Sequence, residues 1–415
     1  MEDLMLLDIN DCGLSLWRGA ERVLHSPGYA YLQGREYQYG ERARGQARLH
    51  PREINHRFWW QLNTEPLQPG FGPARHSADL AHGHLVDMHK QAGQPAQLMM
   101  AVPGSMQRDQ LSLLLGIVEH CPFDVVGLVD RAIASVAHIP LEPQSHYLEL
   151  QLHQALITHM SVSQDQVQRD SVIPIPGCGW LAVQDSLAQA IADAFIRQTR
   201  FDPRRKAATE QQLYDKLPQI LQQLAQRREY NLELDGHHVR LDQDSLTEAC
   251  SKHYQRIMHA LPGPETQLLL DPTVALLPGL DKQFSNTAVA ESGNLGQSVE
   301  QHRDIIAARD GDIHFITSLP VAAAQAVIAA APEPIPEPAP APPPPPPLPK
   351  EEPSSYRIEY TAGRFTLYPG TGEPPKVNGT QITAALQLRP GDSIEVAGGE
   401  VLKLQTADTG DGAKT

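Results

Sequence analysis

The chain has 415 residues, 34 of them Lys or Arg and 49 Asp or Glu, which gives a formal net charge of −15. A chain this acidic disfavours a general nucleic-acid or anionic-membrane surface, because both need clustered Lys and Arg to displace counterions. We therefore expect protein partners, no nucleic-acid binding, and room for about two or three domains.

The cysteine usage and the N-terminus bear on where the protein works. Glu2 and Asp3 stand where a secretory signal would carry basic residues, and the longest weakly polar run, 319–332, is too short to cross a bilayer. The cysteines are scattered without CxxC spacing, which favours reduced thiols over a zinc ribbon or a disulfide framework: Cys12, Cys121, Cys178 and Cys250. These features predict a soluble cytoplasmic protein without membrane insertion.

The first 330 residues alternate strand-like and helix-like stretches, as an α/β protein does. The pattern predicts, in chain order, a hairpin over 3–19, a buried strand over 96–104, a helix over 108–121, a strand over 123–130 and a helix over 131–139.

The hairpin pattern then returns over 147–163. It is followed by a helix over 186–199, a helix over 211–228 that Pro218 can interrupt, and a hairpin over 230–242. The stretch "LLLDPTVALLPGL" at 268–280 predicts a buried strand, a tight turn and a helix start. Two halves that each open with a hairpin predict an internally duplicated fold.

The composition changes abruptly at Ala331, where "APEPIPEPAPAPPPPPPLPKEEP" begins. Proline removes backbone donors and fixes φ, so 331–354 is predicted to be a semi-rigid linker, with a PxxP ligand as the alternative. Alternating stretches after it predict a small β-domain over 355–407, and 408–415 is predicted to be a disordered tail.

Taken in order, the segments from about 4 to 330 resemble the nucleotide-binding domain of the heat shock protein 70 family, in the actin-like ATPase superfamily. "LLDINDCGLSLWRG" is similar to the first phosphate hairpin, with Asp8 at the position of the leading aspartate. "MMAVPGSMQRDQLSLLLGIVEHCPFDVVGLVDRAIASVAH" is the most specific match. The resemblance implies two lobes of a duplicated actin-like fold, with ATP and Mg²⁺ held between them.

The expected phosphate turns depart from the family pattern. The family holds phosphate with backbone N–H groups in glycine-rich turns, whereas the first turn here reads Asn10-Asp11-Cys12-Gly13 and the second, 149–154, has no glycine. The third contact reads Asp271-Pro272-Thr273, and "HRFWWQLN" stands where the family has its catalytic lysine. The remnant nucleotide cleft is predicted to comprise Asp8, Asn10, Gly13, Glu149, Gln151, Asp271, Thr273 and Gly279.

These departures predict a pseudo-ATPase with no catalytic residues and no cofactor, ATP with Mg²⁺ being the alternative. Asp8 and Glu149 are expected to be solvated or hydrogen-bonded carboxylates rather than Mg²⁺ ligands. No metal site is expected at "HGHLVDMH", whose histidines are predicted to be exposed on a helix: His82, His84 and His89. Adjacent aromatic residues cannot all face one core, so one of three is a candidate for a protein interface: Phe58, Trp59 and Trp60.

The C-terminal stretch "KVNGTQITAALQLRPGDSIEVAGGEVLKLQT" is weakly similar to the last strands of a forkhead-associated domain. The phosphate-reading pattern of that family is not evident beyond Gly363-Arg364, so the default is a structural β-module for protein contact.

Three functions remain open. The first is a non-catalytic scaffold or assembly subunit that binds a partner, which can be a related active subunit. The second is a divergent ATP-binding chaperone or assembly factor of the same superfamily. The third is a phosphopeptide-reading adaptor that acts through the C-terminal module.

Overall fold

The computed structural model describes residues 4–263, 266–307, 313–321, 356–361, 364–370, 374–389, 391–396 and 401–403. The chain divides into two compact units, 1–330 and 331–415, which are described separately. The predicted linker 331–354 and the predicted tail 408–415 lie outside the described residues.

The first sheet of the larger unit has six strands in the order β16-β8-β7-β1-β2-β3. The pairs β1–β2 and β2–β3 are antiparallel, whereas β1–β7, β7–β8 and β8–β16 are parallel. The predicted hairpin over 3–19 and the predicted strands over 96–104 and 123–130 are therefore confirmed. The strand bounds are β1 Leu4–Asp8, β2 Leu14–Arg18, β3 Glu21–Ser26, β7 Gln97–Val102, β8 Asp124–Asp130 and β16 Phe315–Ile316.

The second sheet has the order β15-β14-β9-β10-β11-β17. Here β9–β10, β10–β11 and β11–β17 are antiparallel, whereas β9–β14 and β14–β15 are parallel. A three-stranded antiparallel meander followed by two parallel strands thus occurs in both sheets, as β3-β2-β1-β7-β8 and β11-β10-β9-β14-β15; the first sheet adds the parallel strand β16 and the second adds the antiparallel strand β17. The strand bounds are β9 Gln144–Leu150, β10 Gln154–Ser163, β11 Gln166–Pro176, β14 Gln267–Leu270, β15 Thr287–Val289 and β17 Ser318–Pro320.

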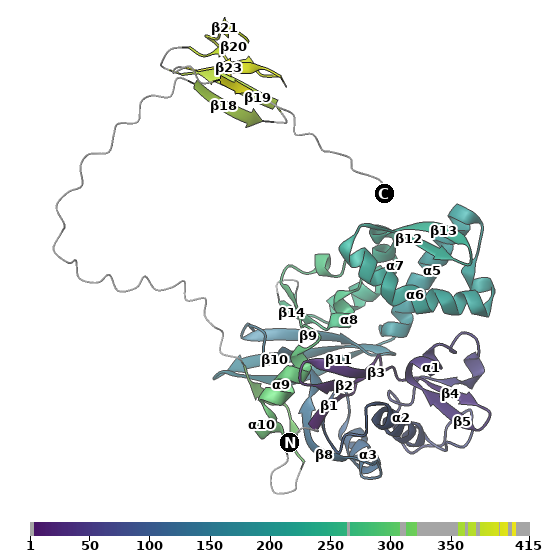
Figure 1. Ribbon diagram of the computed structural model, residues 1–415. Helices are drawn as coiled ribbons and strands as arrows, with labels where there is room; N and C mark the ends of the chain where they lie inside the picture. The colour runs from purple at the N-terminus through teal and green to yellow at the C-terminus, as the bar shows by residue number, and fades with distance from the viewer. Residues whose placement is uncertain are drawn as a thin grey trace, which may run out of the picture. The chain divides into compact units, whose positions relative to one another are not determined.

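Helices accompany each sheet (Figure 1). Near the first sheet lie α2 (Ser77–Gln91) and α3 (Arg108–Val118), and α4 (Arg131–Val136) packs against α9 (Asn294–Gln301), which precedes α10 (Arg303–Ile306). The helices α5 (Trp180–Thr199), α6 (Ala207–Gln226) and α7 (Gln243–His259) gather with a separate hairpin in the second lobe. Pro218 lies inside α6 without ending it, so the predicted interruption does not occur.

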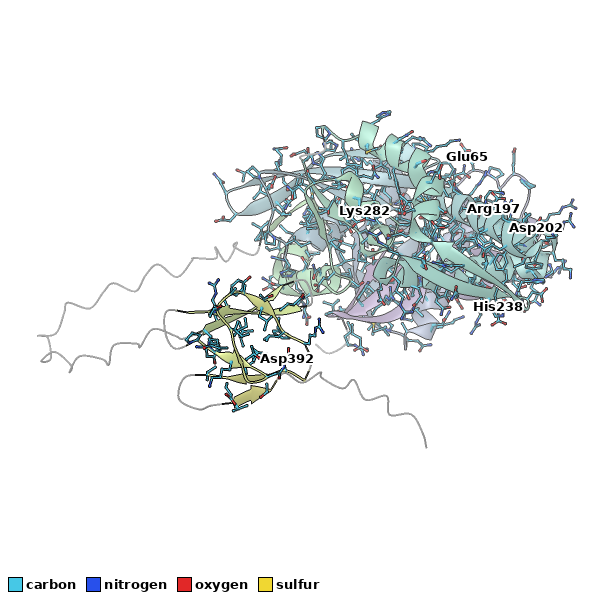
Figure 2. The ribbon with its side chains drawn as sticks, turned by 90° about the horizontal axis from the view of Figure 1, so that it is seen from above. Glu65, Arg197, Asp202, His238, Lys282 and Asp392 are labelled. Atoms are coloured by element: carbon cyan, nitrogen blue, oxygen red, sulfur yellow. The ribbon has the colours of Figure 1, made fainter. Side chains whose placement is uncertain are left out.

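That hairpin joins β12 (Glu229–Leu234) to β13 (His237–Asp242). Asp235 and Gly236 both have positive φ, 50° and 76°, as a two-residue type I′ turn requires. Alternate side chains, Leu232, Leu234, Val239 and Leu241, are buried against the helices, while His238 points outward (Figure 2). The predicted hairpin over 230–242 is confirmed.

Smaller elements complete the larger unit. A three-stranded sheet and a short helix follow β3 in the first lobe: β4 Ala30–Gln33, β5 Glu36–Tyr39, α1 Gly40–Arg44, η1 Pro51–Glu53 and β6 Ile54–Asn55. The second lobe adds η2 Pro203–Arg205, α8 Pro272–Ala275 and η3 Asp281–Gln283.

Three large apolar cores and one small cluster, formed by Tyr29, Ala43 and Leu152, hold the described part of the unit together. One fills the first lobe around Leu7, Leu80 and Met100, and another fills the second around Leu187 and Leu217. The third takes side chains from both sheets and from α4 and α9, including Leu6, Ile133, Tyr147, Leu269 and Val299. Burial between the sheets therefore joins the lobes into one body.

The described part of the smaller unit is all β. Its sheets are β18-β19-β22 and β21-β20-β23-β24, around a core of Leu367, Val377, Leu388 and Ile394. An Asn-Gly turn joins β20 to β21, with φ of 53° at Asn378 and 80° at Gly379. The strand bounds are β18 Tyr356–Thr361, β19 Arg364–Pro369, β20 Lys376–Val377, β21 Thr380–Gln381, β22 Leu386–Gln387, β23 Ser393–Glu395 and β24 Val401–Lys403.

Candidate functional site

Three carboxylates meet where strands of the two sheets end. Asp8 is the last residue of β1 in the first sheet, Glu149 is the penultimate residue of β9, and Asp271 directly follows β14. Because β9 and β14 are parallel neighbours, their carboxyl ends lie at the same edge of the second sheet. All three side chains are buried, at 3%, 1% and 3% exposed.

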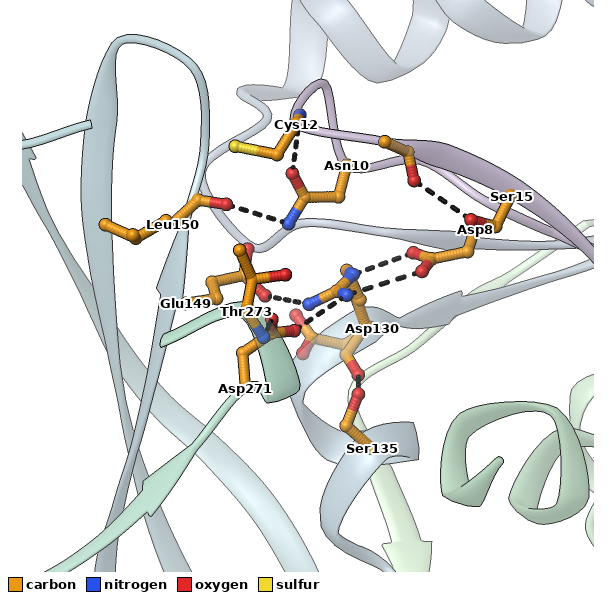
Figure 3. Close-up of polar contacts among 12 residues, drawn as sticks. Asp8, Asn10, Cys12, Ser15, Asp130, Ser135, Glu149, Leu150, Asp271 and Thr273 are labelled. Atoms are coloured by element: carbon orange, nitrogen blue, oxygen red, sulfur yellow. Dashed lines mark hydrogen bonds and ion pairs between the residues drawn. The ribbon is translucent and has the colours of Figure 1, made fainter. Parts of the chain in front are cut away.

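The guanidinium group of Arg131 lies among these carboxylates (Figure 3). Its Nε donates to Asp8 Oδ1 at 2.7 Å, one terminal nitrogen donates to Glu149 Oε2 at 2.6 Å, and the other donates to Asp271 Oδ2 at 3.0 Å. Tyr147 donates its hydroxyl to the same oxygen of Asp271, also at 3.0 Å. A single arginine therefore ties an acid of the first sheet to two acids of the second.

The position of Arg131 follows from the junction of β8 and α4. Asp130 ends β8 and caps α4, because its carboxylate accepts the N–H of Ile133 at 3.1 Å. The same carboxylate accepts from Arg169 of β11 at 2.6 Å. Arg131 is the first residue of the helix, so the capped turn fixes the direction in which its side chain leaves the backbone.

One cation and three acids leave the cluster with an excess of negative charge. Burial would lower the pKa of Arg131, but the neighbouring carboxylates, Asp8 foremost, raise it above its usual value. Burial raises the pKa of Asp8, and it raises the pKa of Glu149 to about 7, with Arg131 opposing both shifts. Oε1 of Glu149 has no hydrogen-bond partner among the described residues. Burial therefore moves the titration of Glu149 toward neutral pH.

The first two expected phosphate turns are hydrogen-bonded to each other. The carboxylate of Asp11 accepts the backbone N–H of Leu152 at 2.7 Å, and the amide of Asn10 donates to the carbonyl of Leu150 at 3.0 Å. Burial raises the pKa of Asp11 to about 7, opposed by its backbone hydrogen bonds. The N–H of Leu152, in the turn where the resemblance places a phosphate contact, thus already has an anionic acceptor within the protein.

The third turn is a short helix start, as its sequence predicts. Asp271 caps α8 by accepting the N–H of Thr273 at 2.9 Å, and Pro272 occupies the first helical position, where its missing N–H costs no hydrogen bond. The carboxylate of Asp271 therefore serves both the cap and Arg131, which leaves little freedom for it to turn toward another ligand.

A cavity of about 350 Å³ lies beside the cluster. Of the predicted cleft residues, those that line it are Asp8, Asn10, Gly13, Asp271 and Thr273. Glu149 reaches the same place only through Arg131.

Two predicted cleft residues lie elsewhere. Gln151 lines a separate cavity of about 150 Å³, and its side chain accepts from Gln154 at 2.7 Å. Gly279 packs against Thr247 of α7 with a φ of 71°. These two positions serve the local backbone and packing.

The aromatic residues after β6 divide between core and surface. Phe58 and Trp59 are 1% and 4% exposed and belong to the core of the first lobe, so they are removed from the interface candidates. Trp60 is half-buried and stacks on His153 of the second lobe with ring centroids 4.8 Å apart.

The prediction that the helix histidines are exposed is wrong for two of them. His84 is fully buried in α2, where its Nδ1 accepts from Trp59 at 3.0 Å and its Nε2 lies 2.7 Å from the hydroxyl of Ser26. His89 is also buried and hydrogen-bonds the carbonyl of Pro95. Burial lowers the pKa of His84 to about 3, so the ring is neutral and acts as an internal polar bridge.

The described residues include neither a metal-binding cluster nor a membrane-spanning helix. They hold no group of three or more His, Cys, Asp or Glu arranged to bind a metal ion. No described helix has both the length and the apolar character that crossing a membrane demands. The four cysteines are free thiols.

Sequence reasoning missed Arg131 and the pair Asp130–Arg169. An Asp-Arg dipeptide between an apolar strand and a small-residue helix was the available signal, since a charged residue next to a buried strand end needs a partner. The partner could not be named from the sequence because Asp8, Glu149 and Asp271 are distant along the chain.

The comparisons with known proteins found no protein-family model that matches the chain and no curated protein that matches it.

Proposed function

We propose that the unit 1–330 is a non-catalytic body of the duplicated actin-like type, related to the nucleotide-binding domain of the heat shock protein 70 family, and that it works by binding other proteins. Two observations support the fold. Five successive strands of each sheet, β8-β7-β1-β2-β3 and β15-β14-β9-β10-β11, pair in the same senses, and acidic residues from both sheets meet where strands end.

The observation that carries the loss of catalysis is the position of Arg131. In the family that the sequence resembles, aspartates at this place hold Mg²⁺ through water, and phosphate lies next to the ion. Here the guanidinium contacts all three carboxylates at 2.6–3.0 Å. A protein cation thus fills the position in which the acids would serve a metal ion.

Mg-ATP does not fit the residues present. The lining of the 350 Å³ cavity contains no lysine; of its two arginines, Arg131 is paired with the acids and Arg22 lies over the ring of Trp17. The N–H of Leu152 is already bonded to Asp11. Freeing the acids requires breaking a buried ion pair, which costs about 3–5 kcal/mol. Each 1.4 kcal/mol is tenfold in affinity, so this cost alone weakens binding by roughly two to four powers of ten.

The test is the thermal unfolding midpoint of the full chain with and without millimolar Mg-ATP. A functional site would add about 2.7 kcal/mol at a hundredfold excess over Kd, whereas the proposal expects the midpoint seen with Mg²⁺ alone. A saturable rise specific to ATP, abolished by Asp271→Asn, would contradict the proposal and restore the ATP-binding chaperone or assembly factor.

The proposed partners are proteins, because the net charge of −15 disfavours nucleic acid. Co-purification of the full chain and of a chain that ends at residue 330 separates the roles of the two units. If the larger unit is the binding body, the same partner is retained by both chains. Loss of the partner from the shorter chain would instead favour an adaptor that acts through the C-terminal module.

A further inference from the structure

A second cavity, of about 400 Å³, lies where the two lobes meet on the side of α1. We call it the junction cavity. The first lobe contributes residues from 29 to 57, and the second contributes residues around His153, the start of α5 and the middle of α6. It is separate from the Arg131 cluster, because none of Asp8, Arg131 or Asp271 lines it. Its size and its place between two lobes are typical of small-molecule sites.

Two almost fully buried polar side chains lie in the wall of the junction cavity without partners. Tyr29 is 5% exposed and Gln184 is 4% exposed, and neither the hydroxyl nor the carboxamide has a hydrogen-bond partner among the described residues. Neither is among the polar atoms sealed in the packed interior, so both reach the cavity surface. Buried polar groups are nearly always hydrogen-bonded, which makes two open ones in one cavity an indication of a ligand.

The charged groups of the lining are three arginines and one aspartate. Arg48 lies over the ring of Tyr214, 3.7 Å from its centroid, and donates to Asp185 at 2.8 Å. Arg44 pairs with Glu41 and Asp215, which stand outside the lining. Arg57 has no acidic partner among the described residues and lies at the exposed edge of the cavity.

The wall is held in place by contacts between the lobes. The backbone N–H of Arg48 donates to Gln211 of α6 at 2.7 Å, and the amide of Gln211 donates back to the carbonyl of Arg44 at 3.1 Å. On the opposite side, the rings of His56 and His153 are 3.1 Å apart at their nitrogens. The arginines therefore stand on a segment that is already ordered, which lowers the entropy cost of holding a ligand.

We propose that the junction cavity binds a small oxyanion-bearing molecule, a phosphate or a polycarboxylate. Arg57, together with Arg48 of the same lining, holds the anionic group, because arginine presents a planar fork of donors that matches carboxylate and phosphate. Tyr29 and Gln184 hydrogen-bond the remainder of the molecule. The ligand contacts both lobes, so its binding stabilises the junction independently of any nucleotide in the cleft.

The test measures the unfolding midpoint of the full chain against three probes, inorganic phosphate, pyrophosphate and citrate, at millimolar concentration with sodium chloride of matched ionic strength as the reference. At least one probe is expected to raise the midpoint saturably, and the phosphate and carboxylate probes separate the two chemistries. If none of the three raises the midpoint above the salt reference, the proposal is wrong.

Two variants locate the effect. Arg57→Gln is expected to weaken the binding of the active probe about tenfold or more, because it removes a charge-assisted contact. Arg42→Gln is the matched control, since Arg42 is an exposed arginine of the first lobe that does not line the cavity. The affinity of this variant for the active probe should equal that of the unmodified chain. Equal weakening by both variants would mean that general surface charge attracts the anion, which overturns the site.

Tyr29→Phe tests the same cavity without changing a charge. It removes a hydroxyl that has no partner in the protein, so folding stability without ligand should be unchanged while affinity for the probe falls several-fold. Unchanged affinity in Tyr29→Phe together with unchanged affinity in Arg57→Gln would place the bound anion elsewhere.

Discussion

Replacing Arg131 with alanine should destabilise the protein in a manner that depends on pH. The substitution leaves Asp8, Glu149 and Asp271 buried near one another without the cation that contacts all of them. Removal of one member of a buried ion pair costs about 3–5 kcal/mol. For a unit of 330 residues, that is a fall of about 4–7 °C in Tm.

The assay is thermal unfolding followed by tryptophan fluorescence and circular dichroism at pH 7.5 and at pH 5. The fall in Tm of Arg131→Ala should be smaller at pH 5, because the carboxylates can then bind protons instead of repelling one another. Burial already raises the pKa of Glu149 to about 7 in the intact cluster. Adding Mg²⁺ at pH 7.5 should recover part of the loss in Arg131→Ala and none in the unmodified chain. Arg131→Lys is the charge-preserving control. Its Tm should lie between those of Arg131→Ala and the unmodified chain, because one ammonium group cannot contact three acids with the geometry of a guanidinium. A Tm within 1 °C of the parent at pH 7.5, or an equal deficit at both pH values, would refute the reasoning.

Two further predictions concern single side chains. Glu149→Gln should flatten the pH dependence of stability. Because the pKa of Glu149 is raised in the folded state, this residue lowers the unfolding free energy as the pH rises from 4.5 to about 7. In urea titrations, the unfolding free energy of the variant should therefore rise relative to that of the parent across this window. His84→Leu should destabilise by about 2–4 kcal/mol, because the indole N–H of Trp59 and the hydroxyl of Ser26 lose their buried partner. Ser26→Ala leaves the hydrogen bond from Trp59 to His84 intact, so it should lower the unfolding free energy less than His84→Leu does in the same chemical unfolding assay. An equal loss of stability in the two variants would assign the effect to packing.

The elements that local sequence predicts well are those whose periodicity and turn residues agree. The hairpin over 230–242 combines strict alternation of apolar and polar side chains with an Asp-Gly turn. Both central residues of that turn take the positive φ that the type I′ geometry needs. "LLLDPTVALLPGL" is similar, because an apolar run, a capping aspartate and a proline at the first helical position specify strand, cap and helix start in order. Such features depend on neighbours within a few residues, and a single sequence contains them.

The histidines show where local reasoning fails. A polar residue on a helix is more often exposed, and the pattern around His84 does not distinguish a solvent face from a core face that holds a hydrogen-bonding ring. The burial of His84 is decided by Trp59 and Ser26, which come from a loop and from β3. A buried polar group is tolerated only when distant partners satisfy it, and those partners are set by the tertiary fold.

The site fails to appear in the sequence for the same reason, at a larger scale. The acidic residues were identifiable as departures from glycine-rich turns, because their effect on an approaching phosphate is local. Arg131 was not, because its partners stand 123, 18 and 140 positions away. At its own position it is only the first residue of a short helix.

Asp130 and Arg131 also tie the two sheets of the larger unit to each other. The two residues are adjacent at the end of β8 in the first sheet, yet Asp130 pairs with Arg169 of β11, and Arg131 pairs with Glu149 and Asp271 beside β9 and β14. Three ion pairs from one dipeptide therefore cross from one sheet to the other, two of them in the place where the resemblance puts a ligand. A ligand that bridges two lobes shifts their equilibrium only by its difference in affinity for the open and closed arrangements. Under the proposed function the protein's own side chains supply that difference, so closure of the lobes is expected not to depend on nucleotide.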